Sequence, residues 1–400
     1  MEHWYAATAL PLADGCGFEA LNNPGRATMM VTQTAVMCGV GACVPERVVG
    51  NDEFAARLET SDAWIRSRTG IQRRRMVMPG TSTGDLAVGA GRAAMKSAGA
   101  DADFVLLATT TPDRPCPATA PEVAHRLGLG NVPALDISAV CSGFLYGLAL
   151  AKALVMSGAC RRPLLIGAEV YSSIIDPQDR NTAVIFGDGA GAVLLRGGDR
   201  REAGAIHAAT LGSDGAGVNL ITVAAGGSRR PRTAGDAPRE DRYFRMRGRE
   251  VYQQAVRWMT TSSRVVLDQA GWPPDSVEAF IGHQANQRIL DAVADRLGVP
   301  ASYRFGNIAE VGNTAAASIP LALADTAARR LVFPGTRSVF TAFGGGLTWG
   351  AVALTWPDVL PVRLAPETLT APSPIPAING EVAPPRQTSA QPWRLPTGIS

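Results

Sequence analysis

Residues 134–156 read ALDISAVCSGFLYGLALAKALVM, and this stretch decides the fold class. Its first part, residues 134–140, is an apolar run that predicts a buried strand. Residues 144–156 are apolar nearly all round, so they predict a deeply buried helix. Cys141, Ser142 and Gly143 form the turn between the two. A strand that passes through a short turn into a buried helix is typical of α/β proteins.

The same alternation extends to both sides of this stretch. We expect further strands at residues 104–110, 163–168, 279–281 and 338–343, and helices at residues 118–127 and 285–297. Two glycine-rich turns, FGDGAGAVLL at residues 186–195 and FGGGLTWGAVAL at residues 343–354, each close a run of these units. Similar endings predict a duplicated α/β architecture, with two unrelated glycine turns as the alternative.

The two ends of the chain differ from its middle. Residues 1–30 show no sustained periodicity, and we expect a disordered N-terminal extension there. We assign the first α/β half to residues 31–200 and the second to residues 201–357. Residues 358–400 are rich in proline and are expected to form a disordered tail, because they cannot bury enough surface to offset their ordering entropy.

The composition excludes several classes of protein. Of 400 residues, 46% are hydrophobic and 18% charged, which excludes global disorder. The net charge of +3 lacks the basic excess of a nucleic-acid-binding protein. We therefore expect no nucleic-acid partner, and we read the run Arg73-Arg74-Arg75 as a solvated charged face. No apolar run is long enough to cross a membrane, and the first residues do not resemble a secretory signal.

The cysteines and histidines indicate the compartment. Six cysteines occur without any C-x-x-C pair, and there are only four histidines. This pattern favours a reducing, cytoplasmic compartment and argues against a structural metal site. We therefore expect no metal.

Cys141 is the cysteine whose position suggests chemistry. It follows a predicted strand and opens a predicted helix, where the positive end of the helix dipole and free N–H groups would lower the pKa of a thiol. The turn also lies at the edge of a sheet where α/β proteins place their active sites. The residue is either a nucleophile or a small buried hydrophobe.

His283 and Asn313 occupy comparable places in the second half. His283 follows a short predicted strand and precedes a helix, and Asn313 lies between Gly312 and Thr314 ahead of another apolar helix. Read alone, each has a structural explanation, the asparagine as a helix N-cap. Together with Cys141 they would form a Cys–His–Asn set suited to acyl chemistry.

Five segments in order resemble β-ketoacyl-ACP synthase III, a condensing enzyme of the thiolase fold. They are TSDAWI with RTGI at residues 60–71, AVCSGF at 139–144, HQANQRI at 283–289, GNTAA at 312–316 and AFGGGLTWG at 342–350. The resemblance covers roughly residues 31–356. It implies a thiolase-like fold of two duplicated halves in α-β-α-β-α layers.

The resemblance also implies the roles of the catalytic residues. Cys141 matches the nucleophile that takes an acyl group from acyl-CoA. His283 and Asn313 match the pair that stabilises the enolate formed when malonyl-ACP loses CO2. The backbone N–H groups of Cys141 and Gly345 match the oxyanion hole for the tetrahedral intermediates.

Contacts with the substrates follow from the same resemblance. Thr60, Trp64, Arg68, Arg180 and Asn286 match residues that bind coenzyme A, with Trp64 and Arg180 on either side of the adenine. Arg288 matches a docking residue for the acyl carrier protein. Cys116 stands where many members carry a phenylalanine in the acyl pocket, across a dimer interface. A smaller side chain there predicts room for primers longer or more branched than acetyl.

The expected function is therefore an acyl-CoA-primed decarboxylative condensation with malonyl-ACP, in fatty-acid or polyketide initiation. The enzyme would be a homodimer that binds no permanent cofactor and uses a coenzyme A thioester as substrate. The alternative is an acyltransferase on the same scaffold, which passes the acyl group from Cys141 to a hydroxyl or an amine. Asn313 favours condensation, and Cys141 argues against a catalytically silent partner subunit.

Overall fold

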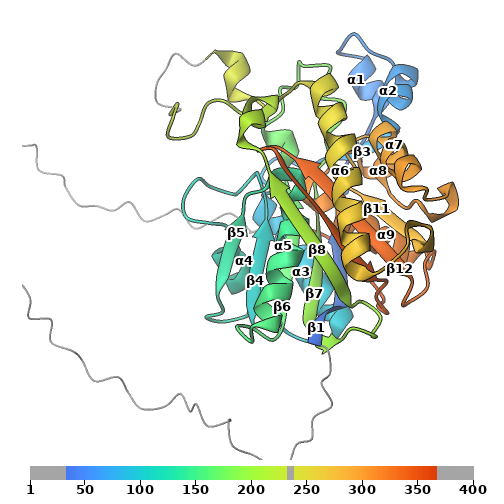
Figure 1. Cartoon of the computed structure of the whole chain (residues 1–400). Coiled ribbons are helices and arrows are strands. Elements are labelled where there is room, and N and C mark those ends of the chain that lie inside the picture. The colour runs from blue at the N-terminus through green and yellow to red at the C-terminus, as the bar shows by residue number, and fades with distance from the viewer. Residues whose placement is uncertain (1–32, 232–237, 367–400) are drawn as a thin grey trace, which may run out of the picture.

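The computed structural model describes residues 33–231 and 238–366. Two sheets dominate these residues (Figure 1). The first has six strands in the order β14-β1-β7-β6-β4-β5, and the second has four in the order β11-β12-β13-β8. Their bounds are β1 Gln33–Cys43, β4 Phe104–Ala108, β5 Ala134–Ile137, β6 Pro163–Glu169, β7 Gly189–Asp199, β8 Ile206–Ser213, β11 Ala279–Gly282, β12 Arg337–Gly344, β13 Thr348–Thr355 and β14 Val362–Leu364.

The two sheets repeat one topology. In the first, β4 and β6 are parallel, whereas β6 and β7, and β7 and β1, are antiparallel. In the second, β11 and β12 are parallel, whereas β12 and β13, and β13 and β8, are antiparallel. The two glycine-rich turns lead into the equivalent strands β7 and β13. The expected duplication is therefore confirmed in the strand order.

Helices fill three layers around the two sheets. Leucines and alanines of α5 (Gly143–Met156) and α9 (Ser318–Ala328) share one buried core with both sheets, so these helices lie between them. Helices α3 (Thr83–Ala98) and α4 (Ala120–Arg126) pack on the outer face of the first sheet. Helices α6 (Gly248–Ala270) and α7 (Gln287–Leu297) cover the second. The layers are α-β-α-β-α, as expected.

Smaller elements gather around the ends of the central strands and form a fourth buried cluster. They are α1 (Asn51–Ala55), α2 (Asp62–Thr69), α8 (Ile308–Val311) and two small sheets, β2 (Val48–Gly50) with β3 (Arg73–Arg75) and β9 (Ile221–Thr222) with β10 (Arg245–Met246). The cluster includes Cys141, so these elements enclose the candidate nucleophile.

Several sequence-based expectations need correction. The strand expected at residues 134–140 ends at Ile137, and Val140–Ser142 form a 3-10 turn instead. The helix α5 is not buried throughout: Leu150 and Met156 are exposed, whereas Ala151 is fully buried in the core between the sheets.

The ends of the folded part also differ from expectation. The disordered tail is expected to begin at residue 358, but Val362–Leu364 form strand β14, which pairs in parallel with β1. The structured part therefore extends to these residues. The expected extension at residues 1–30, and the tail beyond residue 366, lie outside the described residues.

The arginine run is a solvated face only in part, because Arg73 is exposed whereas Arg74 is buried. Arg74 is fully buried. Its guanidinium donates to Asn51 Oδ1 at 2.8 Å and to the Val184 carbonyl, and it stacks over the ring of Phe54. Burial lowers the pKa of Arg74 to about 10. Its neighbour Arg73 pairs with Glu310. The run therefore contributes to packing at β3.

Candidate active site

Cys141 lies at the turn between β5 and α5, where the sequence places it. The preceding residue, Val140, has a φ of 46°, which is unusual for a β-branched residue and turns the chain sharply. The equivalent turn in the second half has Ala315 at a φ of 45°, just before α9. The two turns pack together, with a Cβ built at Gly143 lying 3.7 Å from Ala316 Cβ. Each half therefore contributes one strained turn, and the two turns contact each other at the start of α5 and α9.

The environment of the Cys141 thiol differs from the expectation. Burial, followed by the Glu169 carboxylate, raises the pKa of Cys141 well above its ordinary value, and only its own backbone N–H acts in the other direction. The expected lowering of the thiol pKa is therefore wrong for this state of the site. The thiol must lose its proton as it attacks the substrate.

The Gly344–Gly346 turn approaches Cys141 closely. A Cβ built at Gly344 would lie 2.8 Å from the Cys141 backbone nitrogen, and one at Gly345 would lie 3.3 Å from Val140 Cγ2. Only glycine permits this approach. The expected oxyanion-hole residues, Cys141 and Gly345, are therefore neighbours in space.

A hydrogen-bond link that the sequence did not reveal holds these two turns together. Ser142 Oγ lies 2.7 Å from Thr348 Oγ1, although the residues are 206 positions apart. Both hydroxyls also approach the Ala139 carbonyl, and Thr348 Oγ1 donates to the Gly345 carbonyl at 2.9 Å. The link fixes the turn that carries the nucleophile against the turn that carries Gly345.

His283 follows β11 and is buried, with 2% of its surface exposed. Its Nδ1 lies 2.7 Å from Ser318 Oγ, and that oxygen also accepts from the Gln284 backbone N–H at 3.4 Å. A Ser318 hydroxyl that donates to Nδ1 leaves the imidazole proton on Nε2, and this is the tautomer that the expected role of His283 requires. Burial lowers the pKa of His283 to about 3, so the ring is neutral at physiological pH.

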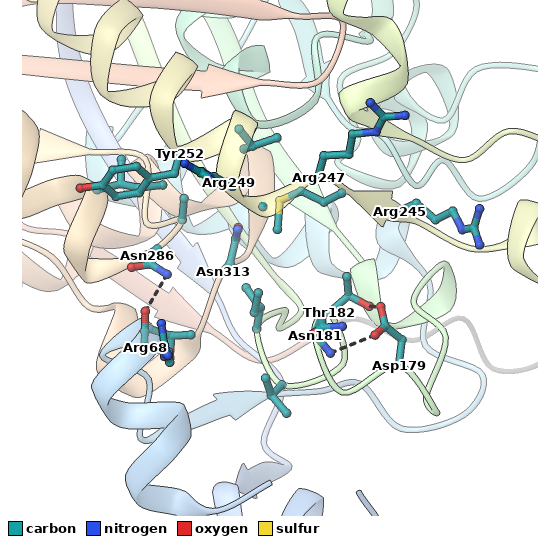
Figure 2. Close-up of a pocket in the computed structure, with 18 of the residues that line it drawn as sticks. Arg68, Asp179, Asn181, Thr182, Arg245, Arg247, Arg249, Tyr252, Asn286 and Asn313 are labelled. Atoms are coloured by element: carbon teal, nitrogen blue, oxygen red, sulfur yellow. Dashed lines mark hydrogen bonds between the residues drawn. The ribbon is translucent and has the colours of Figure 1, made fainter. Parts of the chain in front are cut away.

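Asn313 is held by its backbone and by one side-chain atom. Its backbone pairs with Ile185 and Gly187, and its Oδ1 accepts from the Ala315 N–H at 2.9 Å. The amide nitrogen is left to face the cavity described below (Figure 2). Asn313 precedes α9 and His283 contacts Ser318 at the start of that helix, so both residues lie near this end of α9.

Glu169, at the end of β6, is a buried charge that sequence reasoning did not find. Its carboxylate accepts from Thr111 Oγ1 at 2.6 Å and from the Thr110 N–H at 3.1 Å. Burial raises the pKa of Glu169 to about 7, against these hydrogen bonds and one from the Ala316 backbone, which lower it. Glu169 thus connects the end of β4 to the turn that follows Asn313.

A cavity of about 1180 Å³ leads to Asn313 from the surface. Its walls come from α2, residues 179–185, the β9–β10 pair and the first turns of α6 and α7 (Figure 2). Five arginines and two aspartates line it: Arg68, Arg245, Arg247, Arg249, Arg288, Asp179 and Asp241. Among the described residues, the guanidinium groups of Arg68, Arg247 and Arg249 have no ion-pair or hydrogen-bond partner. The cavity is suited to a polyanionic ligand.

Of the two residues expected to flank the adenine, Trp64 lines this cavity, and Arg180 lies over its ring and leaves no space for a base. Arg180 Cζ lies 5.2 Å from the centre of the Trp64 ring. An aromatic base needs about 7 Å between two flat groups, twice a stacking distance of roughly 3.5 Å. Arg180 also donates to the Glu59 carbonyl at 2.9 Å. The guanidinium would have to swing away to admit a base.

The remaining expected contacts fall into three groups. Arg68, Asn286 and Arg288 line the cavity. Asn286 is already engaged, because its Oδ1 caps α7 through the Arg288 N–H and its Nδ2 donates to the Arg68 carbonyl (Figure 2). Thr60 does not line the cavity and is half-buried. Cys116 is exposed on the loop after β4 and does not line the cavity of its own chain.

Two further features bear on the expected partners. Among residues 33–231 and 238–366, no group of three or more His, Cys, Asp or Glu is placed to hold a metal ion. In the same residues, no helix combines the length and the apolar character needed to cross a membrane.

Comparison with known proteins identifies the family. A sequence model described as 3-oxoacyl-[acyl-carrier-protein] synthase III matches residues 135–215, and the model of its C-terminal part matches residues 267–356. The chain is 57% identical over 335 residues to β-ketoacyl-[acyl-carrier-protein] synthase III 3 of Streptomyces coelicolor, covering 83% of this chain and 100% of the relative. The chain belongs to the β-ketoacyl-ACP synthase III family. It is therefore an enzyme of the synthase III type.

Solved structures of synthase III proteins agree with this assignment. The crystal structure of 3-oxoacyl-(acyl carrier protein) synthase III from Pseudomonas aeruginosa has a TM-score of 0.77 and 49% identity, covering 82% of this chain and 100% of that one. The priming β-ketosynthase of the R1128 polyketide biosynthetic pathway has a TM-score of 0.76 and 33% identity, covering 81% and 96%. The expected thiolase-like fold is confirmed. Cys141 lies in the first region that matches synthase III, and His283, Asn313 and Gly345 lie in the second.

Proposed function

We propose that this synthase III family member condenses an acyl-CoA primer with malonyl-ACP and releases a β-ketoacyl-ACP. The observation that carries the proposal is that the Cys141 turn packs against the turn before α9, where Asn313 and the Ser318 partner of His283 also lie. The three groups are a cysteine on a strained turn, a neutral histidine whose Nδ1 meets the Ser318 hydroxyl, and an asparagine that lines a cavity rich in arginine. No permanent cofactor is needed for this chemistry.

In the first step, Cys141 Sγ attacks the thioester carbonyl of the acyl-CoA. The backbone N–H groups of Cys141 and Gly345 would stabilise the oxyanion. The carbon–sulfur bond to coenzyme A breaks, and the proton of the Cys141 thiol passes to the departing thiolate. Glu169 would hold the surrounding turns in place without touching the substrate.

In the second step, the malonyl group loses CO2, and the electron pair of the broken bond forms an enolate. His283 Nε2–H and Asn313 Nδ2–H would donate to its oxygen. The enolate carbon then attacks the acyl carbon on Cys141. The new carbon–carbon bond replaces the carbon–sulfur bond, and the Cys141 thiolate takes up a proton.

The cavity supports the choice of substrates. Trp64, Arg68, Arg180 and Asn286 are proposed contacts for coenzyme A, and Thr60 contributes at their edge. The unpaired arginines suit the phosphates of coenzyme A and of the phosphopantetheine arm, and Arg288 suits the acidic carrier protein.

We also propose that the enzyme is a homodimer in the cytoplasm. The strand β5 lies at the edge of the six-stranded sheet, and its Leu135 is 38% exposed. A second copy that paired along this edge would cover it and bring its Cys116 loop towards the site. The five described cysteines are free thiols, which fits a reducing compartment. Light scattering that found a stable monomer at micromolar concentration would count against the dimer.

The experiment that tests the function is intact-protein mass spectrometry after incubation with acyl-CoA, followed by addition of malonyl-ACP. The expected result is one acyl group on Cys141, no acylation of Cys141→Ala, and release as a β-ketoacyl-ACP. An adduct on Cys116 or Cys160 would overturn the assignment of the nucleophile. Transfer of the unextended acyl group to a hydroxyl or amine would support the acyltransferase alternative.

A further inference from the structure

Tyr171 is a fully buried aromatic residue in the same buried cluster as the candidate nucleophile. It begins a 3-10 turn, Tyr171–Ser173, directly after β6, and none of its surface is exposed. Its ring stacks on Phe186, with centroids 4.5 Å apart, and meets Phe244 edge to face at 5.4 Å. The two phenylalanines also contact each other at 5.0 Å. The Tyr171 ring is therefore held in one position.

The hydroxyl of this ring has no partner. Among the described residues, Tyr171 Oη is buried and makes no hydrogen bond. A buried hydroxyl without a partner destabilises a folded protein, and phenylalanine would fill the same space without that penalty. Within the described residues, the hydroxyl is therefore free to meet a group that is not part of the folded chain.

The residues around the Tyr171 ring indicate the partner of its hydroxyl. Tyr171, Phe186, Phe244 and Cys141 belong to one buried cluster. Burial raises the pKa of Tyr171 well above its ordinary value, and the charges that add to this effect are those of Cys141 and then Glu169. The phenol therefore stays protonated and can donate. Glu169 is not its acceptor, because the Glu169 oxygens accept from Thr110 and Thr111 instead.

We propose that the Tyr171 hydroxyl donates a hydrogen bond to the acyl group on Cys141 and so favours primers that carry an oxygen acceptor over hydrocarbon primers of the same size. The inference rests on the proposed function, because it needs an acyl group on Cys141. It concerns primer chemistry, whereas the exposed Cys116 concerns primer size.

The size of the preference follows from one neutral hydrogen bond in a dry site. A site that gains such a bond with one substrate, and leaves a buried donor unpaired with the other, discriminates by about tenfold. Tyr171→Phe removes the donor and should remove the discrimination. It removes a single atom from a packed ring, so the phenylalanine fits the same space.

The test uses the full chain and a pair of primers of equal size, 3-hydroxybutyryl-CoA and 3-methylbutyryl-CoA, in which a hydroxyl replaces a methyl group. The rate of Cys141 acylation is followed by intact mass, and kcat/KM is obtained for each primer. In Tyr171→Phe the ratio of the two kcat/KM values should shift about tenfold towards the hydrocarbon primer. Tyr303→Phe, a half-buried tyrosine packed against the outer helices, is the matched control and should leave the ratio unchanged.

The outcomes separate the two proposals. Normal acylation with the same primer ratio in the parent chain and Tyr171→Phe overturns this inference alone. No acylation of the parent chain by any acyl-CoA overturns the proposed function and this inference with it. Thermal unfolding gives a second check: the Tm of Tyr171→Phe should equal or exceed that of the parent, and a fall of several degrees would show that the hydroxyl already has a partner.

Discussion

Replacement of Ser318 by alanine tests how the histidine is prepared for catalysis. Ser318 is fully buried at the start of α9, and its hydroxyl lies 2.7 Å from His283 Nδ1. A hydrogen bond donated by this hydroxyl to Nδ1 favours the tautomer with its proton on Nε2. Without it, Nδ1 has no partner, and the tautomer that carries its proton on Nδ1 becomes competitive. That tautomer has no N–H to offer the enolate.

The expected size of the effect follows from this geometry. The loss of one buried hydrogen bond costs about 1 to 1.5 kcal/mol, which corresponds to roughly fivefold to tenfold in an equilibrium or a rate. Loss of an oxyanion donor altogether costs about 10² to 10³ in kcat. Ser318→Ala should therefore lower malonyl turnover about tenfold, less than His283→Ala. Acylation of Cys141 should change by less than about twofold, because His283 is assigned to the second step.

The assay measures CO2 release from malonyl-ACP by the preformed acyl-enzyme. Ser263→Ala is the control, since Ser263 is also fully buried and its hydroxyl donates at 2.7 Å, but to the Met259 carbonyl on α6. The pKa of His283 is about 3, so the effect of Ser318→Ala should not vary between about pH 6 and pH 9. Unchanged turnover, or an equal loss of acylation, would refute the reasoning, as would a further loss when Ser318→Ala is added to His283→Ala.

Three other changes test separate parts of the site. Asn313→Ala should leave acylation of Cys141 measurable and lower malonyl turnover about 10² to 10³-fold, and normal condensation by this variant would favour the acyltransferase alternative. Glu169→Gln should be better tolerated at pH 8 than at pH 5. Burial raises the pKa of Glu169 from an ordinary 4.5 to about 7. Between pH 4.5 and pH 7, the folded parent therefore keeps the Glu169 proton that the unfolded chain has already released. The free energy of unfolding of the parent falls as the pH rises through this range. Denaturant unfolding at pH 5 and pH 8 gives the free energy of unfolding of parent and variant, and their difference should shift in favour of the variant by up to about 3 kcal/mol at pH 8. Equal changes with pH in both proteins would contradict this. Cys116→Phe should lower kcat/KM for a longer, branched primer several-fold relative to acetyl-CoA, and an unchanged ratio would exclude a role for Cys116 in the pocket.

The duplicated α/β architecture and the place of the nucleophile could be predicted from local sequence. Periodicity along residues 134–156 depends only on neighbouring residues, and it located α5 and the turn that carries Cys141. The two glycine-rich turns predicted the equivalent strands β7 and β13. The five motifs, taken in order, carry the resemblance to the family, because five matches in the right order are specific although each motif alone is weak.

The surroundings of these residues could not be predicted in the same way. Ser318 lies 35 positions from His283 and Thr348 lies 206 from Ser142, so no local pattern links either pair. Arg74 reads as one of three surface arginines until β3 packs it against Asn51 and Phe54.

The sequence by itself determined which elements form and which residue types stand at the ends of their strands, because these depend on local periodicity and turn chemistry. Only the tertiary structure decided the ionisation of those residues. The pKa of Cys141 rises although a helix start alone would lower it, and Glu169 becomes a carboxyl group with a pKa of about 7. Both shifts come from desolvation by segments distant in the chain, and desolvation exists only once those segments have packed.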